Sequence, residues 1–273
     1  MAKPPGGESF SEYIQHHLTF WTSPAHGGVW SVNVDTLTVS CVIGAIFLLW
    51  FWWLSSKATS GVPSKAQAFI ELAVEFVDGQ VKDAWHGSRR FLGPLALTLF
   101  FWILLMSLLD VVPVDFIPSI AEGSGATFFR PVPTADANAT FGMSITVLII
   151  TLFCGFKAKG VIGYPKGLLT GPFKADGVLM KIVLAPANLL MAVIEITTQP
   201  LSLALRLFGN IFAGELLFML LAGLMSHFAS IWYPLGIIGY AAWSMVELLI
   251  IFIQAFIFMY LSVTYITMAQ ESH

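Results

Sequence analysis

One apolar run, residues 178–225, does most to limit what this chain can fold into. Its charged residues are only Lys181, Glu195, Arg206 and Glu215. A straight helix of this length would extend roughly 72 Å at about 1.5 Å per residue, more than twice the ~30 Å hydrocarbon core of a bilayer. The run therefore predicts a membrane helix that tilts steeply or projects beyond the membrane on one side. Points where such a helix can bend are Pro186, Pro200 and Gly209.

Composition assigns the whole chain to the membrane. Hydrophobic residues make up 57% of its 273 residues and charged residues 11%, whereas soluble domains carry about 25% charged residues. We predict an all-α polytopic membrane protein. The two cysteines, Cys41 and Cys154, lie in apolar runs and indicate neither a disulfide framework nor a metal site. The small net charge of −3 gives no indication of nucleic-acid binding.

Five segments are long and apolar enough to cross the membrane. We predict spans at about residues 37–56, 91–112, 137–156, 178–225 and 234–268, the last two forming a long tilted helical hairpin. Residues 64–86 place apolar side chains at helical spacing between acidic ones, which is typical of an amphipathic helix on the membrane surface. Residues 1–36 lack the apolar stretch of a cleavable signal, so we expect an external segment before a single transmembrane domain, 37–273.

The basic residues orient these spans. Ten of the thirteen lie between the first and second spans or between the third and fourth, up to Lys181, and only Lys3 and Arg130 lie on the opposite side. Loops rich in lysine and arginine stay in the cytoplasm. We therefore predict that the N-terminus lies outside the cytoplasm and the C-terminus inside it. The thirteenth basic residue is Arg206.

Arg206 is a charge in the middle of the longest apolar run. An ionised group at the bilayer centre costs several kcal/mol, and such groups mark ion pathways or have a buried partner. The guanidinium group does not lose its proton in proteins, so the charge is fixed. At 100° per residue, one helical face collects the polar residues Glu195, Gln199, Ser202, Arg206 and Asn210, which we call the polar stripe. Glu215 points to roughly the opposite side.

Polar residues on the last helix are expected to face the fourth. Glu247 and Gln254 are seven residues apart and share a helical face, and exposing them to lipid would be costly. Small residues interleave with the stripe and allow a helix to approach closely, either within the chain or from a partner. They are Ala204, Gly209, Ala213 and Gly214.

Each polar position also has a structural interpretation. Arg206 could form a structural ion pair with a glutamate, and Gln254 a simple hydrogen bond between helices. Asp110 and Asp115 flank Pro113 at a membrane edge, where they could cap a helix. His227 lies in a short outer loop, where it is either solvated or able to feed protons inward.

Two blocks resemble a known family. Leu203-Ala204-Leu205-Arg206-Leu207-Phe208-Gly209-Asn210 with Ala213-Gly214-Glu215, and the run from Glu247 to Met259, are similar to the signatures of the a subunit of bacterial F-type ATP synthases. The resemblance extends from about Val32 to the C-terminus. It implies a non-catalytic stator subunit of the membrane Fo sector, in the bacterial inner membrane with a periplasmic N-terminus. The implied partners are a rotating ring of c subunits, a b-subunit stalk and the remainder of the F1Fo complex.

The same resemblance implies roles for the polar residues. Arg206 matches the arginine that attracts the deprotonated carboxylate of a c subunit and separates two half-channels. Asn210, Glu215, Glu247 and Gln254 match positions of the periplasmic half-channel. Glu195 and Ser202 are expected in the cytoplasmic half-channel by their position, with Gln199, Asp110, Asp115 and His227 as further candidates. The transported ion is expected to be H⁺, and neither a cofactor nor a metal is implied.

One position departs from a common version of the pattern. Some relatives carry histidine where Glu247 stands, and here both Glu215 and Glu247 are carboxylic acids. We expect the two to share a proton and to relay protons inward. Two other functions remain open on the sequence. One is a self-contained ion or anion transporter that uses Arg206 as an anion site. The other is a membrane scaffold in which Arg206 is structural.

Overall fold

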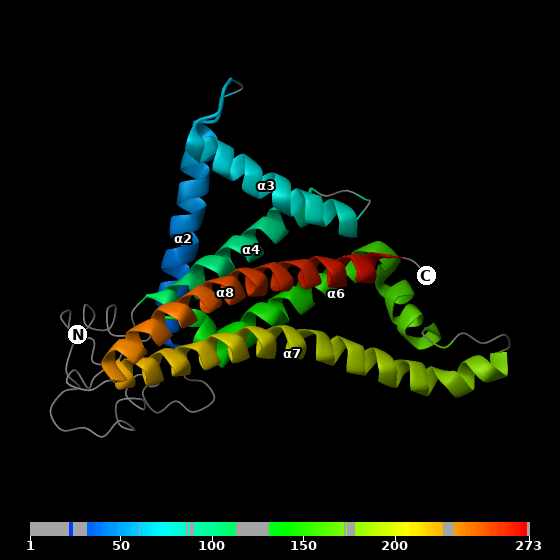
Figure 1. Ribbon diagram of the computed structural model, residues 1–273. Helices are drawn as coiled ribbons and strands as arrows, with labels where there is room; N and C mark the ends of the chain where they lie inside the picture. Colours follow the sequence, from blue (N-terminus) through cyan, green and yellow to red (C-terminus); the bar gives the residue numbers. More distant parts are fainter. Residues whose placement is uncertain are drawn as a thin grey trace.

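The computed structural model describes residues 22–23, 32–59, 61–85, 87, 90–112, 131–171, 173, 178–225 and 232–271. Helices dominate these residues (Figure 1): α2 (Val34–Ser56), α3 (Lys65–Ala84), α4 (Leu92–Leu108), α6 (Ala137–Thr170), α7 (Val178–Met225) and α8 (Trp232–Gln270). Two short 3-10 turns, η2 (Leu109–Val111) and η3 (Pro133–Ala135), flank α4 and α6. A two-residue antiparallel pair, β1 (Thr22–Ser23) with β2 (Val32–Asn33), precedes α2. The all-α prediction is confirmed.

Five of these helices are long and apolar enough to cross a membrane. They cover Val34–Ser56, Leu92–Val111, Ala137–Thr170, Val183–Leu224 and Tyr233–Gln270. The count of five agrees with the predicted spans, and so does their order along the chain. The predicted residues Asp115 and His227 and most of the segment 1–36 lie outside the described residues.

The third long helix continues beyond the predicted end at residue 156. At Gly160 the backbone takes φ 77° and ψ 166°, so α6 consists of two helices joined at a bend. Glycine adopts positive φ without a steric penalty. After the bend, Tyr164 packs so closely on Gly155 that a Cβ there would lie 2.5 Å from the ring. The lysines around 157–159, which suggested the end of a span, lie instead beside this bend.

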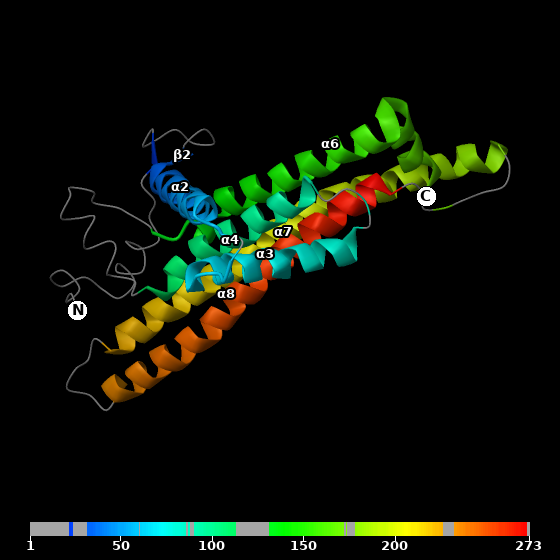
Figure 2. The ribbon, with the colours of Figure 1, turned by 90° about the horizontal axis from the view of Figure 1, so that it is seen from above.

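The amphipathic helix α3 connects α2 to α4. The Ser64 hydroxyl caps its first turn by accepting a hydrogen bond from the Gln67 N–H at 3.3 Å. Val77 and Val81 are buried where α3 contacts α4 and α8, whereas Phe69 and Leu72 remain exposed. Figures 1 and 2 show α3 running from the end of α2 back over α4 and α8.

The long hairpin of α7 and α8 forms the centre of the molecule. The two helices run side by side in both views, and α6 accompanies part of α7 (Figures 1 and 2). We call the end where α7 finishes and α8 starts the turn end, and the opposite end the open end. Apolar side chains pack between these helices, α4 and α6, among them Leu203, Leu207, Ile211, Ile251, Ala255 and Phe258. The packed interface between α7 and α8, which we call the hairpin seam, therefore fixes where the polar side chains of these two helices lie.

Candidate functional site

The hairpin seam has a regular antiparallel register. The Asn210 amide nitrogen donates a hydrogen bond to the Gln254 side-chain oxygen at 3.0 Å. Moving toward the turn end, Gly214 faces Glu247, and the rings of Phe218 and Tyr240 lie 4.9 Å apart between centroids. This register brings Glu247 and Gln254 against α7, which confirms the prediction that both face the fourth helix.

Glu247 packs directly against a glycine of α7. Its side chain is fully buried. A Cβ built on Gly214 would lie 2.8 Å from both carboxylate oxygens, closer than real Cβ contacts. Neither oxygen has a hydrogen-bond partner among the described residues, although buried polar groups in proteins are normally satisfied. The carboxyl group is thus held against the α7 backbone with its bonding capacity unused.

Glu215 is buried next to this contact, with 4% of its surface exposed. It follows Gly214 directly on α7 and takes part in an interaction of its own. The sequence predicts that Glu215 lies on a different face of α7 from the polar stripe. The burial pattern agrees, because Glu215 is buried whereas the stripe residues Arg206 and Asn210 are partly or fully exposed. Two buried acidic residues therefore lie at the same level of the hairpin, on the turn-end side of Arg206.

Arg206 is half-buried and has a weak intrachain partner. One guanidinium nitrogen lies 3.4 Å from the Ser202 hydroxyl one turn earlier. Within the part of the chain that the structure describes, it forms no hydrogen bond or ion pair with a carboxylate. The structural ion pair considered from the sequence is therefore not formed by these residues. The fixed charge is left available to a group from outside the chain.

The small residues around the polar stripe divide into two sets. Ala204 and Gly214 are buried within the chain, so they serve intrachain packing. Gly209 and Ala213 are exposed, and a Cβ on Gly209 would meet nothing within 4 Å. Together with the half-exposed Leu205 they form an open, nearly smooth strip of α7, the small-residue face, beside Arg206. A second helix could approach the backbone closely there.

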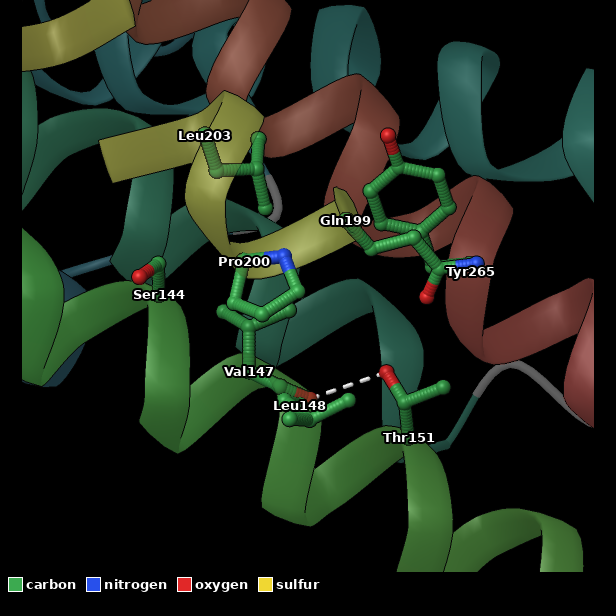
Figure 3. Close-up of a pocket in the computed structure, with 8 residues that line it drawn as sticks. All are labelled: Ser144, Val147, Leu148, Thr151, Gln199, Pro200, Leu203 and Tyr265. Atoms are coloured by element: carbon green, nitrogen blue, oxygen red, sulfur yellow. Dashed lines mark hydrogen bonds between the residues drawn. The ribbon is translucent and has the colours of Figure 1, made fainter. Parts of the chain in front are cut away.

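The polar residues on the open-end side of Arg206 are arranged differently. Glu195 is exposed and accepts a long hydrogen bond of 3.4 Å from the Gln199 amide. Gln199 and Tyr265 lie at a recess between α6, α7 and α8, and Pro200 points toward Val147 of α6 (Figure 3). The recess is too narrow to admit a water molecule. The described residues therefore enclose no aqueous passage at this recess.

A group of buried polar residues near the N-termini of α2 and α6 was not predicted. The Asn33 amide donates to Asp136 at 2.6 Å, and the other Asp136 oxygen caps α6 by accepting from the Asn138 N–H at 2.9 Å. Asp35, two residues after Asn33 in the first turn of α2, is fully buried. The sequence signal was an aspartate directly before a helical run, which favours an N-cap. Predicted candidate Asp110 is also buried, in η2, and is partnered.

Trp243 is a further residue that no sequence pattern singled out. Its indole nitrogen is buried without a hydrogen-bond partner among the residues described, one turn of α8 from Glu247.

The chain also shows no group of three or more His, Cys, Asp or Glu side chains within the described ranges that could hold a metal ion.

Comparison with known proteins gives a consistent result over nearly the whole chain. The family model described as ATP synthase A chain matches residues 37–267. The chain is 46% identical over 269 residues to ATP synthase subunit a of Coxiella burnetii, covering 96% of this chain and 97% of the relative. It is 43% identical to the subunit a of Chromobacterium violaceum, covering 96% and 98% of the two chains. It is also 43% identical to ATP synthase subunit a 1 of Photobacterium profundum, over the full length of both.

Proposed function

The chain belongs to the ATP synthase A chain family, and from this premise we propose that it is the stator subunit that conducts protons through two half-channels past a rotating ring of c subunits. Family membership makes it a multi-pass component of the membrane sector of an ATP synthase. The proposal adds the mechanism. The chain itself breaks no covalent bond, and it couples proton flow to rotation while partner subunits make or hydrolyse ATP.

The observation that carries the proposal is the state of Arg206. Its guanidinium group is half-buried, permanently charged and not neutralised by any described carboxylate of its own chain. A charge of this kind in a membrane marks an ion pathway or pairs with another group. The adjacent small-residue face is open enough for another helix to approach. A carboxylate on that helix, presented by a ring of c subunits, supplies the missing charge when it is deprotonated.

Arg206 also separates the two groups of polar residues. On the turn-end side lie Asn210, Gln254, Glu247 and Glu215, which we assign to the periplasmic half-channel. On the open-end side lie Ser202 and Glu195, which we assign to the cytoplasmic half-channel, with Gln199 beside them. A proton that moved directly between the two groups would have to approach a fixed positive charge, which repels it. Protons must then cross by binding to ring carboxylates and travelling around with the ring.

This assignment includes an orientation and further partners. The turn end faces the periplasm and the open end the cytoplasm, in agreement with the distribution of lysine and arginine in the loops. The N-terminus is periplasmic and the C-terminus cytoplasmic, in a bacterial inner membrane. The b-subunit stalk and the F1 sector complete the assembly.

A self-contained transporter is the alternative function. Such a protein needs a passage or binding site enclosed by its own helices. The recess beside Gln199 is too narrow for water, and Arg206 is only half-buried, next to the exposed small-residue face. We therefore favour the subunit function. The two are separated by reconstitution, because a transporter works alone whereas this chain would require a c ring.

The test uses inverted membrane vesicles that carry the complete ATP synthase. Arg206→Ala is compared with wild type for ATP-driven proton pumping and for proton-driven ATP synthesis, and assembly is followed on native gels. We expect both activities to disappear while the complex still assembles. Persistence of both coupled activities would refute the proposal. Loss of assembly alone, rescued by a neutral residue of similar size such as Arg206→Gln, would favour a structural role.

A further inference from the structure

A buried hydrogen-bond donor lies one helical turn before the buried acid Glu247 on α8. The Trp243 indole N–H and both Glu247 carboxylate oxygens have no hydrogen-bond partner among the described residues. The two residues are four apart on α8, so they are neighbours on one helical face. That face is turned toward α7, since Glu247 packs on Gly214. Three unused hydrogen-bonding atoms therefore belong to two residues one helical turn apart on the seam face of α8.

A single unpaired buried atom could result from imperfect packing, whereas an unpaired donor one helical turn from two unpaired acceptors calls for a shared explanation. Leaving one buried polar group unsatisfied costs about 1–3 kcal/mol, so a fold that leaves three together forgoes a large stabilisation. Buried polar groups that lack protein partners are commonly bridged by ordered water, which needs two to four polar neighbours. The N–H of Trp243 and the oxygens of Glu247 provide such neighbours.

The position of Trp243 along the seam places it on the turn-end side of Glu247, farther from Arg206. From Arg206 toward the turn end, the seam passes the Asn210–Gln254 hydrogen bond, then Gly214 with Glu247, then Phe218 with Tyr240. Trp243 lies between the levels of Glu247 and Tyr240. A proton entering from the turn end therefore reaches the level of Trp243 before it reaches Glu247.

We propose that Trp243 is a positioning residue of the proton inlet, whose indole N–H holds a bound water against the carboxyl group of Glu247. In the step that follows, this water gives a proton to a Glu247 oxygen and receives one from the next water outward. Trp243 keeps its own proton throughout and only orients the donor. The inference rests on the proposed function, because it needs Glu247 to lie on a proton path.

Other titratable groups surround this part of the seam. At neighbouring levels of the seam, α7 carries Glu215 and α8 carries Tyr240, and both have interactions of their own. The turn η2, which contacts both helices, adds the buried Asp110. A change in the pH dependence of conduction must therefore be assigned to Glu247 by a double variant and not by the single variant alone.

The experiment measures passive proton conduction through the Fo sector after removal of F1, in vesicles, as a function of pH on the inlet side. Trp243→Phe keeps an aromatic ring and removes the N–H. We expect conduction to fall about three- to tenfold, as for loss of one hydrogen bond, with a changed pH profile and normal assembly. Trp102→Phe is the matched control. Its indole donates to the Ser40 carbonyl at 3.2 Å, away from the seam, so conduction should not change.

A double variant tests the coupling. In a Glu247→Gln background, Trp243→Phe should cause no further loss of conduction, whereas an independent, additive loss would overturn the proposal. Wild-type conduction and pH profile in Trp243→Phe would also overturn it. The Arg206→Ala result separates this failure from failure of the proposed function, because it does not involve Trp243. If Trp243→Phe does not assemble, 3-benzothienylalanine at position 243 retains the ring system, removes only the N–H and is judged by the same outcomes.

Discussion

The two halves of α7 hold their polar residues in different ways. Beyond Arg206 toward the turn end, the polar contacts are made within the chain, by the Asn210–Gln254 hydrogen bond and by Glu247 packed on Gly214. Before Arg206, Glu195 is exposed and bonds only to its neighbour Gln199, at 3.4 Å, among the described residues. A proton path on the turn-end side can thus be built largely by this chain. Under the proposed function, a path on the open-end side would be completed by a surface of a partner subunit.

Arg206 stands at the boundary, and its substitution should have the largest effect. Arg206→Lys keeps the charge but loses the planar guanidinium group, which binds a carboxylate through two parallel hydrogen bonds. We expect ATP-driven pumping to fall about a hundredfold or more. Pumping by Arg206→Lys at close to the wild-type rate would show that a point charge is sufficient and would weaken the proposed contact with a ring carboxylate.

The two glycines offer a direct contrast between the packed side and the open side of α7. In Gly214→Val the new side chain collides with the Glu247 carboxyl group, and overpacking of this kind costs about 1–3 kcal/mol. We expect at least about a tenfold loss of proton conduction and a lower melting temperature of the purified subunit.

Gly209→Val is the matched variant, because nothing within the described chain lies within 4 Å of the added Cβ. The subunit alone should melt as wild type does, whereas coupled pumping in the complete complex should fall if a ring helix approaches this strip. Unchanged pumping would indicate that no partner packs there.

Glu247 and Glu195 compare a buried acid with an exposed one. Glu247→Gln should lower proton conduction about tenfold and alter its dependence on pH at the inlet side, because the variant cannot take up a proton at that position. Glu195→Gln should reduce conduction by less than about threefold, since solvent and neighbouring groups can replace an exposed carboxylate. An unchanged pH profile in Glu247→Gln would refute the inlet relay.

Substitutions that remove the Asn210–Gln254 hydrogen bond should have the smallest effect, and the loss of stability should differ between its two partners. Gln254 is 2% exposed, whereas Asn210 lies on the open side of α7. Asn210→Leu leaves the buried amide of Gln254 without its partner, which costs about 1–3 kcal/mol. Gln254→Leu leaves an exposed amide that other groups can satisfy. Thermal unfolding of the purified subunit should therefore show Asn210→Leu as the less stable variant, and equal melting temperatures would contradict the observed register.

Much of the architecture follows from the sequence alone, for a simple physical reason. Lipid requires long uninterrupted apolar helices, so five spans and the long hairpin can be located from composition and length. Helical periodicity then places Arg206 and Asn210 on one face and Glu215 on another. The same periodicity indicates that Glu247 and Gln254 share a face of the last helix.

Only the tertiary structure decided how these faces meet. Periodicity describes one helix at a time, whereas the rotation of α7 against α8 depends on how their side chains interlock. That rotation buries Gly214 under Glu247 and leaves Gly209 open, although the sequence presents both as small residues beside the polar stripe. It also leaves Arg206 without a carboxylate among the described residues, and it leaves the Trp243 N–H and the Glu247 carboxyl group, one helical turn apart, both buried without a partner there. The sequence determines which positions are charged, polar or small. Only the packed helices determine which of these residues contact one another, because contacts between distant residues depend on side-chain shape.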